Sequence, residues 1–252
     1  MLAALIAASA AFLPPAGRHA PAYPAPRNVP PRLVTYAEFV KEIRTFKAAL
    51  LRALKDERGV PSEDTLACVD ALGEVNPTAP DPATDLDLWP GNYTFCSSCL
   101  ALSAAAGLAL AADAGSASLE PEACTLTFEL RPAGDGDEAA TAVAGTLRLA
   151  GSLAVSADDK LLLRATSYRL ELAADDAALL DACAAAAPSV LAAAGTPTRV
   201  DARTLEASFE NGPQVELTVR YLDQDLLILD PPAEAAGLEA RPAVLSRVKV
   251  NV

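Results

Sequence analysis

The stretch Gln214-Val-Glu-Leu-Thr-Val-Arg-Tyr-Leu-Asp-Gln-Asp-Leu-Leu-Ile-Leu229 decides the fold of this chain. Its first half alternates strictly between apolar and polar residues, and successive side chains of an extended chain point to opposite faces. The alternation therefore predicts a half-buried strand whose apolar face consists of Val215, Leu217, Val219 and Tyr221. The turn residues Asp223-Gln224 and the apolar run that follows them predict an antiparallel hairpin.

The same pattern of short strands and turns fills most of the chain beyond Gly91. We expect strands at about 92–98, 100–111, 123–131, 140–157, 160–173, 198–210, 214–221, 225–229 and 243–250. An alanine-rich helix at 175–194, broken at Pro188, interrupts them. A meander of this length tends to close on itself, so the sequence predicts an antiparallel barrel of about eight to ten strands. A barrel of that size can hold one small apolar ligand.

Two amphipathic helices are predicted before the strands. Between Thr35 and Asp56 apolar residues recur at spacings of three and four, which is the helical period. A second helix is expected to begin at Ser62, which can cap free backbone amides, and to end at Asn76-Pro77. The apolar stripe of the first helix either covers its own barrel, which we favour, or lies on a partner protein or lipid surface.

The first 32 residues have the composition of a targeting segment. Residues 1–11 form an apolar run of signal-peptide length, too short to span a bilayer. Residues 12–32 hold seven prolines and three arginines but no acidic residue, as transit peptides do. This two-part segment resembles the targeting sequence of algal plastids that lie behind extra membranes. The alternative is a secretory signal followed by a proline-rich linker.

The charge of the remaining chain excludes several classes of partner. Three of the 20 basic residues lie in the targeting segment, so 17 basic and 33 acidic residues remain, a formal charge of −16. Such a surface repels phosphate backbones, and nucleic-acid binding is not expected. It also argues against simple electrostatic docking on anionic lipid. No later run of about twenty apolar residues is present, so we expect no membrane-spanning helix.

The supply of catalytic side chains is limited. His19 is the only histidine and lies in the targeting segment, so Ser-His-Asp, Cys-His and the usual histidine-containing metal sites are excluded from the processed chain. The acidic pairs Asp158-Asp159 and Asp175-Asp176 fall at predicted turns, where solvated carboxylates are common. We expect no catalytic residue, no metal and no cofactor. An enzyme using Tyr, Asp, Glu, Lys or Cys is the weaker alternative.

Cys96 and Cys99 form a single Cys-x-x-Cys motif among five cysteines. On the strand expected there, residues three apart point to opposite faces about 10 Å apart, beyond the reach of a disulfide. Zinc binding is the weaker alternative, because a second such motif is missing. The odd, scattered cysteines fit a reducing compartment such as the plastid stroma.

Three blocks of the sequence resemble the plastid lipid-associated proteins, also called fibrillins. The first is a leucine-rich helix that ends in Asn76-Pro77-Thr78 before a proline-rich connector. The second begins at Gly91, in Gly91-Asn-Tyr-Thr-Phe-Cys-Ser-Ser98. The third is Tyr221-Leu222-Asp223-Gln224-Asp225-Leu226, followed by a last strand near 243–245. Together the blocks span about residues 62–250, in the order found in the family.

The chain departs from the family pattern at three positions. Tyr93 stands where tryptophan is usual, Ser97 where tyrosine is usual, and Leu227 where arginine is common. An arginine at position 227 could hold a polar headgroup or a buried carboxylate, and leucine can do neither. A headgroup role at that position is therefore not transferred to this chain.

The resemblance implies a plastid protein with a lipocalin-like barrel, located in the stroma or at lipid globules or thylakoids. It implies binding, sequestration or organisation of lipophilic molecules such as prenylquinones, carotenoids and acyl lipids. The alternative is a partner or scaffold for a plastid enzyme that handles isoprenoids. From the strand pattern we expect the barrel wall to include Tyr93, Phe95, Phe128, Leu130, Phe209, Val219 and Tyr221.

The sequence therefore predicts three regions. Residues 1–32 form the targeting segment, with a signal peptide at about 1–11 and a transit peptide at about 12–32. Residues 33–75 form the helices, and residues 76–252 form the lipocalin-like domain. The alternative for each of the seven predicted wall residues is that its side chain simply fills the barrel interior.

Overall fold

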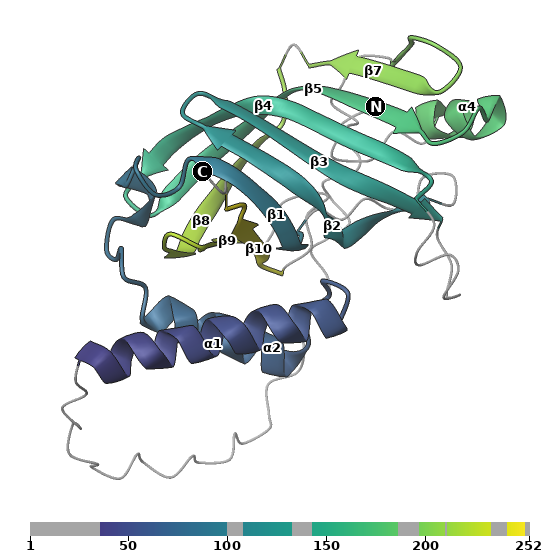
Figure 1. The fold of residues 1–252 in the computed structure, drawn as a ribbon. Coiled ribbons are helices and arrows are strands. Elements are labelled where there is room, and N and C mark those ends of the chain that lie inside the picture. The colour runs from purple at the N-terminus through teal and green to yellow at the C-terminus, as the bar shows by residue number, and fades with distance from the viewer. Residues whose placement is uncertain are drawn as a thin grey trace, which may run out of the picture.

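The computed structural model of the chain describes residues 36–99, 108–132, 143–185, 197–209, 211–232 and 241–249. The targeting segment predicted at residues 1–32 lies outside the described residues. In the described part, two helices precede a mainly antiparallel β structure (Figure 1). The predicted fold class, a mainly β chain with a lipocalin-like barrel behind an N-terminal helical segment, is confirmed.

Eight strands form the closed barrel. They are β1 (Gly91–Ser97), β2 (Leu108–Glu120), β3 (Ala123–Pro132), β4 (Gly145–Ala157), β5 (Lys160–Leu172), β8 (Gln214–Leu222), β9 (Leu226–Asp230) and β10 (Ala243–Arg247). Neighbours in the sheet are β4-β3-β2-β1-β10-β9-β8-β5, and pairing between β4 and β5 closes the ring. Every pairing in the ring is antiparallel. Because the ring is closed, its paired strands leave no free sheet edge.

The strand β5 changes its neighbour halfway along its length. Its first half, Lys160–Arg164, pairs with β8, whereas Ser167–Glu171 pairs with β7 (Thr204–Ser208). The two-residue strand β6 (Thr198–Arg199) then pairs with β7. The sheet therefore extends past the closed ring at this end, beside the helix α4 (Ala177–Ala185) (Figure 1).

The prediction for β2 is wrong in its boundaries. We expected a strand at 100–111, and the structure places β2 at Leu108–Glu120, while residues 100–107 lie outside the described part. The segment from Asp113 to Ser118 is rich in small residues with weak strand propensity. It is extended because β1 and β3 pair with its two sides, and such pairing overrides propensity. A Cβ at Gly115 would lie 2.4 Å from the Thr127 carbonyl oxygen, so glycine permits this close approach.

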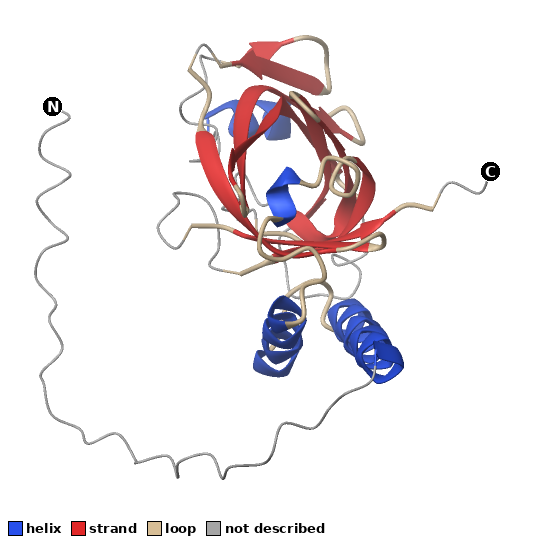
Figure 2. Cartoon of the chain, turned by 90° about the vertical axis from the view of Figure 1, so that its left-hand side faces the viewer, coloured by secondary structure: helices blue, strands red, loops and turns tan. Residues whose placement is uncertain are grey.

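The two N-terminal helices lie against the outside of the barrel. α1 (Tyr36–Asp56) and α2 (Glu63–Glu74) follow the predicted boundaries, and the Ser62 hydroxyl accepts a hydrogen bond from the Thr65 amide as an N-cap. Both helices lie beside β8, β9 and β10 (Figures 1 and 2). A separate cluster of buried side chains joins the two parts: Leu50, Leu54, Val69, Leu72, Tyr221, Leu226, Ile228 and Val244.

Strand β9 shows why the apolar run at its position has no alternation. Leu227 and Leu229 belong to the core inside the barrel, and Leu226 and Ile228 belong to the cluster under the helices. A strand covered on both faces is apolar throughout. The amphipathic stripe of α1 therefore covers the protein's own barrel, which is the arrangement that we favoured.

A short 3-10 helix, η1 (Pro82–Thr84), closes one end of the barrel (Figure 2). The Ala83 amide donates a hydrogen bond to the Asp158 carbonyl in the turn between β4 and β5, at 2.9 Å. Ala83 and Trp89 are buried in the barrel core. The connector between helices and barrel, predicted only as a proline-rich linker, thus forms the floor of the barrel.

Candidate functional site

The barrel surrounds an apolar cavity of about 80 Å³. Its wall comes from all eight strands of the ring and from the chain segments beside them. The lining residues are Phe95, Ser98, Cys99, Leu119, Leu126, Leu149, Leu153, Leu163, Ala165, Pro213, Val215, Leu217, Leu229, Ala243 and Leu245. Only Ser98 and Cys99 carry a polar side-chain atom, and none of the lining side chains is charged.

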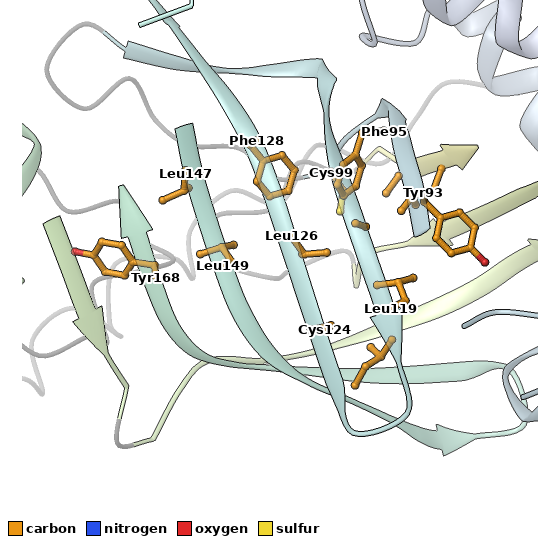
Figure 3. Packing of buried hydrophobic residues seen from close by; sticks show 14 of the residues in the cluster. Tyr93, Phe95, Cys99, Leu119, Cys124, Leu126, Phe128, Leu147, Leu149 and Tyr168 are labelled. Carbon is orange, nitrogen blue, oxygen red and sulfur yellow. The ribbon is translucent and has the colours of Figure 1, made fainter. Parts of the chain in front are cut away.

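The cavity shares the barrel interior with packed side chains of the same core. Phe95 marks one side of it and contacts Phe128, with ring centroids 4.9 Å apart (Figure 3). Leu147, Tyr168 and Leu180 are buried in the same core and do not line the cavity. A cavity of this kind excludes water because its wall offers almost no hydrogen-bond partner, and it can accept hydrocarbon.

The structure brings six of the seven predicted wall residues into the barrel core: Tyr93, Phe95, Phe128, Leu130, Phe209 and Val219. Of these, only Phe95 lines the cavity. Phe209 packs on Tyr168, with centroids 6.0 Å apart, away from the cavity wall.

The expectation that Tyr221 lines the barrel is wrong. Tyr221 is fully buried, but it belongs to the cluster outside the barrel, under α1 and α2. A β-bulge causes this change, because Val219 pairs with Leu229 and Tyr221 pairs with Ile228, which leaves Arg220 as an extra residue. The bulge reverses the facing of every later residue, so Leu222 points inward in place of Tyr221.

The residues missed by sequence reasoning are mainly leucines of β3, β4 and β5, among them Leu126, Leu149, Leu153 and Leu163. Their two-residue alternation in β3 and β4 was the available signal. It identifies the inward face but not the level along the barrel axis. The level decides whether an inward side chain meets the cavity or a packed layer.

Tyr93 and Arg247 form a polar group at the end of the barrel near Trp89. The Tyr93 hydroxyl donates to the Trp89 carbonyl at 2.7 Å, and Arg247 donates to the Tyr93 oxygen at 2.7 Å. Burial raises the pKa of Tyr93, and the arginine partly opposes that rise. Gly91 has φ +152°, and a Cβ there would lie 3.4 Å from the Arg247 guanidinium. Glycine thus suits both the backbone and the space beside this arginine.

The Asn76-Pro77-Thr78 block fastens the end of α2 to the bulge in β8. The Asn76 side-chain amide donates to the Arg220 carbonyl at 3.2 Å, and its oxygen accepts from the Leu222 amide at 3.2 Å. The same oxygen accepts the Thr78 hydroxyl at 2.9 Å. Asn76 thereby pairs backbone groups that the bulge leaves without a sheet partner. The block has a structural role in this chain.

The Tyr221–Leu226 block fastens α1 to the hairpin between β8 and β9. Tyr221 donates its hydroxyl proton to Asp223 at 2.6 Å, and Lys47 of α1 bridges Asp223 and Asp225 at 2.8 and 3.1 Å. The hydrogen bond from Lys47, followed by that from Lys249, lowers the pKa of Asp225. Burial, and then the bond to Asp223, raises the pKa of Tyr221. None of these side chains lines the cavity.

All five cysteines lie in the described residues, and none of them forms a disulfide. Cys96 is partly buried beside the helices, whereas Cys99 lines the cavity, so the two point to different sides of the barrel wall. Burial raises the pKa of Cys96, and it raises the pKa of Cys124 to about 11.

The described residues hold no group of three or more His, Cys, Asp or Glu side chains placed to bind a metal ion. None of the helices in the described ranges is long and apolar enough to cross a membrane. The chain matches no protein-family model, and comparisons with curated proteins and with solved structures give no significant similarity.

Proposed function

We propose that this protein is a non-enzymatic binder of lipophilic molecules and that its binding site is the interior of the barrel. The cavity carries this proposal: a closed antiparallel ring surrounds a space whose described wall is hydrocarbon except for Ser98 and Cys99. The wall offers no carboxylate, amine or guanidinium that could act as a general acid or base. The hydrocarbon side chains of the same wall favour the binding of apolar groups.

Burial of hydrocarbon supplies the affinity. Each methylene removed from water contributes about 0.8 kcal/mol. A tail of ten methylenes contributes about 8 kcal/mol, against which association costs about 4 kcal/mol or more. Micromolar binding thus requires most of a long tail to leave water. No charged group of the protein is needed for it.

The size of the cavity restricts the ligand. Sites that enclose whole drug-sized molecules measure about 300–1,000 Å³, well above the 80 Å³ found here. An enclosed ring system would require several leucines to move. A slender tail needs less width than a ring system and so requires smaller adjustments of the wall.

The cellular setting forms part of the proposal and rests on the sequence resemblance. We place the protein in a plastid, in the stroma or at lipid globules or thylakoids, with prenylquinones, carotenoids or acyl lipids as cargo. The three sequence blocks that resemble the fibrillins support this setting. Two of them contribute structural contacts in this chain, which explains how they can be retained without forming a ligand site.

Lipid extraction tests the proposal. Residues 33–252 are incubated with total plastid lipid, re-isolated, and analysed by native mass spectrometry. We expect one lipid class at near-stoichiometric amount, and we expect Leu149→Trp, which fills the cavity from its wall, to lose it. Leu86→Trp is the matched control, because Leu86 is exposed on the connector. A folded wild-type protein that retains no lipid would refute an internal binding site.

A second candidate function is that of a partner or scaffold for a plastid enzyme. The apolar stripe of α1 no longer supports it, because the barrel covers that stripe. The outward face of α1 does support it. Lys41, Arg44, Arg52 and Lys55 are exposed along one line of that face, and none forms an ion pair among the described residues. This basic line on an acidic protein fits an acidic protein surface.

Charge reversal tests the second candidate without disturbing the core. A photo-crosslinker at the exposed residue Ala48 is expected to join one plastid enzyme. The crosslink is expected to disappear when Arg44 and Arg52 are changed to Glu, and to persist when the exposed Arg148 and Arg169 are changed to Glu. Equal yields from both double variants would exclude the α1 face as the contact.

A further inference from the structure

The wall of the cavity is not equally closed around the ring. Eleven of the fifteen lining residues are buried, and the other four are partly exposed: Leu163, Ala165, Pro213 and Val215. Leu163 and Ala165 belong to β5. Pro213 immediately precedes β8, and Val215 is the second residue of β8. Leu163 pairs directly with Val215, and the Ala165 amide donates to the Pro213 carbonyl at 3.1 Å.

This place is where β5 changes its neighbour. Pairing with β8 ends at Arg164, and pairing with β7 begins at Ser167. Between them the wall is held by single hydrogen bonds, from Ala165 to Pro213 and from Phe209 to the Thr166 carbonyl at 2.9 Å. Thr166 is also an extra residue in the pairing with β4, where Ala150 pairs with Ser167 and Gly151 pairs with Ala165. The regular pairing of the sheet is therefore interrupted beside the partly exposed part of the cavity wall.

We call this place the β5–β8 seam, defined by residues 163–166 and 213–215. The route through the floor is closed by η1 and by Trp89, which is 1% exposed. The seam can open by separation of a few side chains and loss of few hydrogen bonds. Opening the floor would require displacement of a fully packed tryptophan.

Among the seam residues, 163–166 and 213–215, the charged residue is Arg164. Arg164 alternates with Leu163 and Ala165, is exposed, and has Ser152 and Gln214 as its cross-strand neighbours. It forms no ion pair among the described residues. A carboxylate at the seam would meet this guanidinium, whose planar donors suit two carboxylate oxygens. The cavity behind the seam has no group to receive a charged head.

We propose that the ligands are single-chain fatty carboxylates, which enter tail first through the β5–β8 seam and keep the carboxylate outside, at Arg164. This inference rests on the proposed binding function and names its ligand class and entry route. The small cavity suits one slender tail better than a ring system, and the exposed rim keeps the charge hydrated. No part of the ligand head needs to cross the apolar wall.

The ligand class is tested with a fluorescent polyene fatty acid and its methyl ester as probes. Arg164→Gln is expected to weaken binding of the acid about three- to fivefold, the range of an exposed ion pair, and to leave the ester unchanged. Arg148→Gln is the control, because Arg148 is exposed on β4 at another level, opposite Thr127 and Arg169. An equal change for acid and ester, or the same effect from Arg148→Gln, would overturn the assignment of the head.

The route is tested by stopped-flow kinetics of Ala165→Phe, with the exposed Ala154→Phe as control. A narrowed entrance slows association and dissociation together, each by about threefold or more. A phenylalanine that fills the interior would accelerate dissociation, and that result, or unchanged rates, contradicts entry at the seam. Binding of either probe by the wild type keeps the proposed function intact in both cases. Failure of the wild type to bind either probe would overturn the fatty carboxylate as ligand, whereas the lipid extraction described above decides the proposed function.

Discussion

Asn76 is predicted to hold the barrel and the helices together, and replacement by alanine tests that role. Its side chain pairs two backbone groups at the bulge of β8, the Arg220 carbonyl and the Leu222 amide. Leu222 is fully buried, so water cannot easily replace the lost partner of its amide. A buried group without a partner costs about 1–3 kcal/mol, so the two groups together predict a loss of about 2–6 kcal/mol.

The assay is equilibrium unfolding in urea, followed by the fluorescence of Trp89. Trp89 is the only tryptophan and is buried at the floor of the barrel, so its emission reports loss of the core. Asn92→Ala is the control, because the Asn92 side chain is exposed on β1, and it should change stability by less than about 0.5 kcal/mol.

Thr78→Ala gives an intermediate expectation. It removes the hydroxyl that donates to Asn76 at 2.9 Å and should cost about 1 kcal/mol. Because Thr78 acts through Asn76, the double variant should lose less than the sum of the two single losses. An Asn76→Ala protein as stable as Asn92→Ala would refute the structural role that we assign to the Asn-Pro-Thr block.

Three further predictions follow from the ionisable groups. Because the pKa of Asp225 is lower in the folded protein than its unfolded value of about 4, ionised Asp225 contributes stability above about pH 4. This contribution is lost as the pH falls through the folded-state pKa. Replacing Lys47 by Met removes the main cause of the lowered pKa, so the variant should lose less stability on acidification, as acid unfolding measures. The raised pKa of Tyr221 gives stability that is present below about pH 10 and lost above it, so in an alkaline absorbance titration Tyr221 should ionise only as the protein unfolds, and Tyr221→Phe should remove one late tyrosine. Cys124, with its pKa raised to about 11, should resist thiol reagents in the native protein and react once urea unfolds it; rapid labelling of the native form would contradict its burial.

Much of the fold follows from periodicity in the sequence. The helical stripe of α1, the cap at Ser62 and the alternating strands β3 and β8 appear in the structure close to their expected limits. In each case a strong local pattern agrees with the burial of one face. The barrel was predicted because many such strands follow one another with short turns.

The parts that sequence reasoning missed depend on contacts between distant segments. The strand at residues 113–118 is held by its two neighbours and not by its own propensity. The bulge at Arg220 is supported by Asn76, 144 residues earlier in the chain, and it turns Tyr221 out of the barrel. Period-two reasoning cannot locate an extra residue of this kind. The closure of the floor by η1 likewise depends on a contact between distant segments, the hydrogen bond from Ala83 to Asp158. The composition of the connector does not indicate that role.

The central claim is that hydrocarbon binds inside the barrel, and methyl NMR with a spin-labelled fatty acid tests it most directly. A nitroxide near the tail end of a bound stearate broadens only nearby methyl signals. We predict broadening of Leu126, Leu149 and Leu153, which line the cavity, and sharp signals for Leu50 and Leu72 under the helices. The same fatty acid with a reduced label provides the reference spectrum. Broadening restricted to Leu50 and Leu72, with the cavity leucines sharp, would contradict the claim and place the lipid outside the barrel.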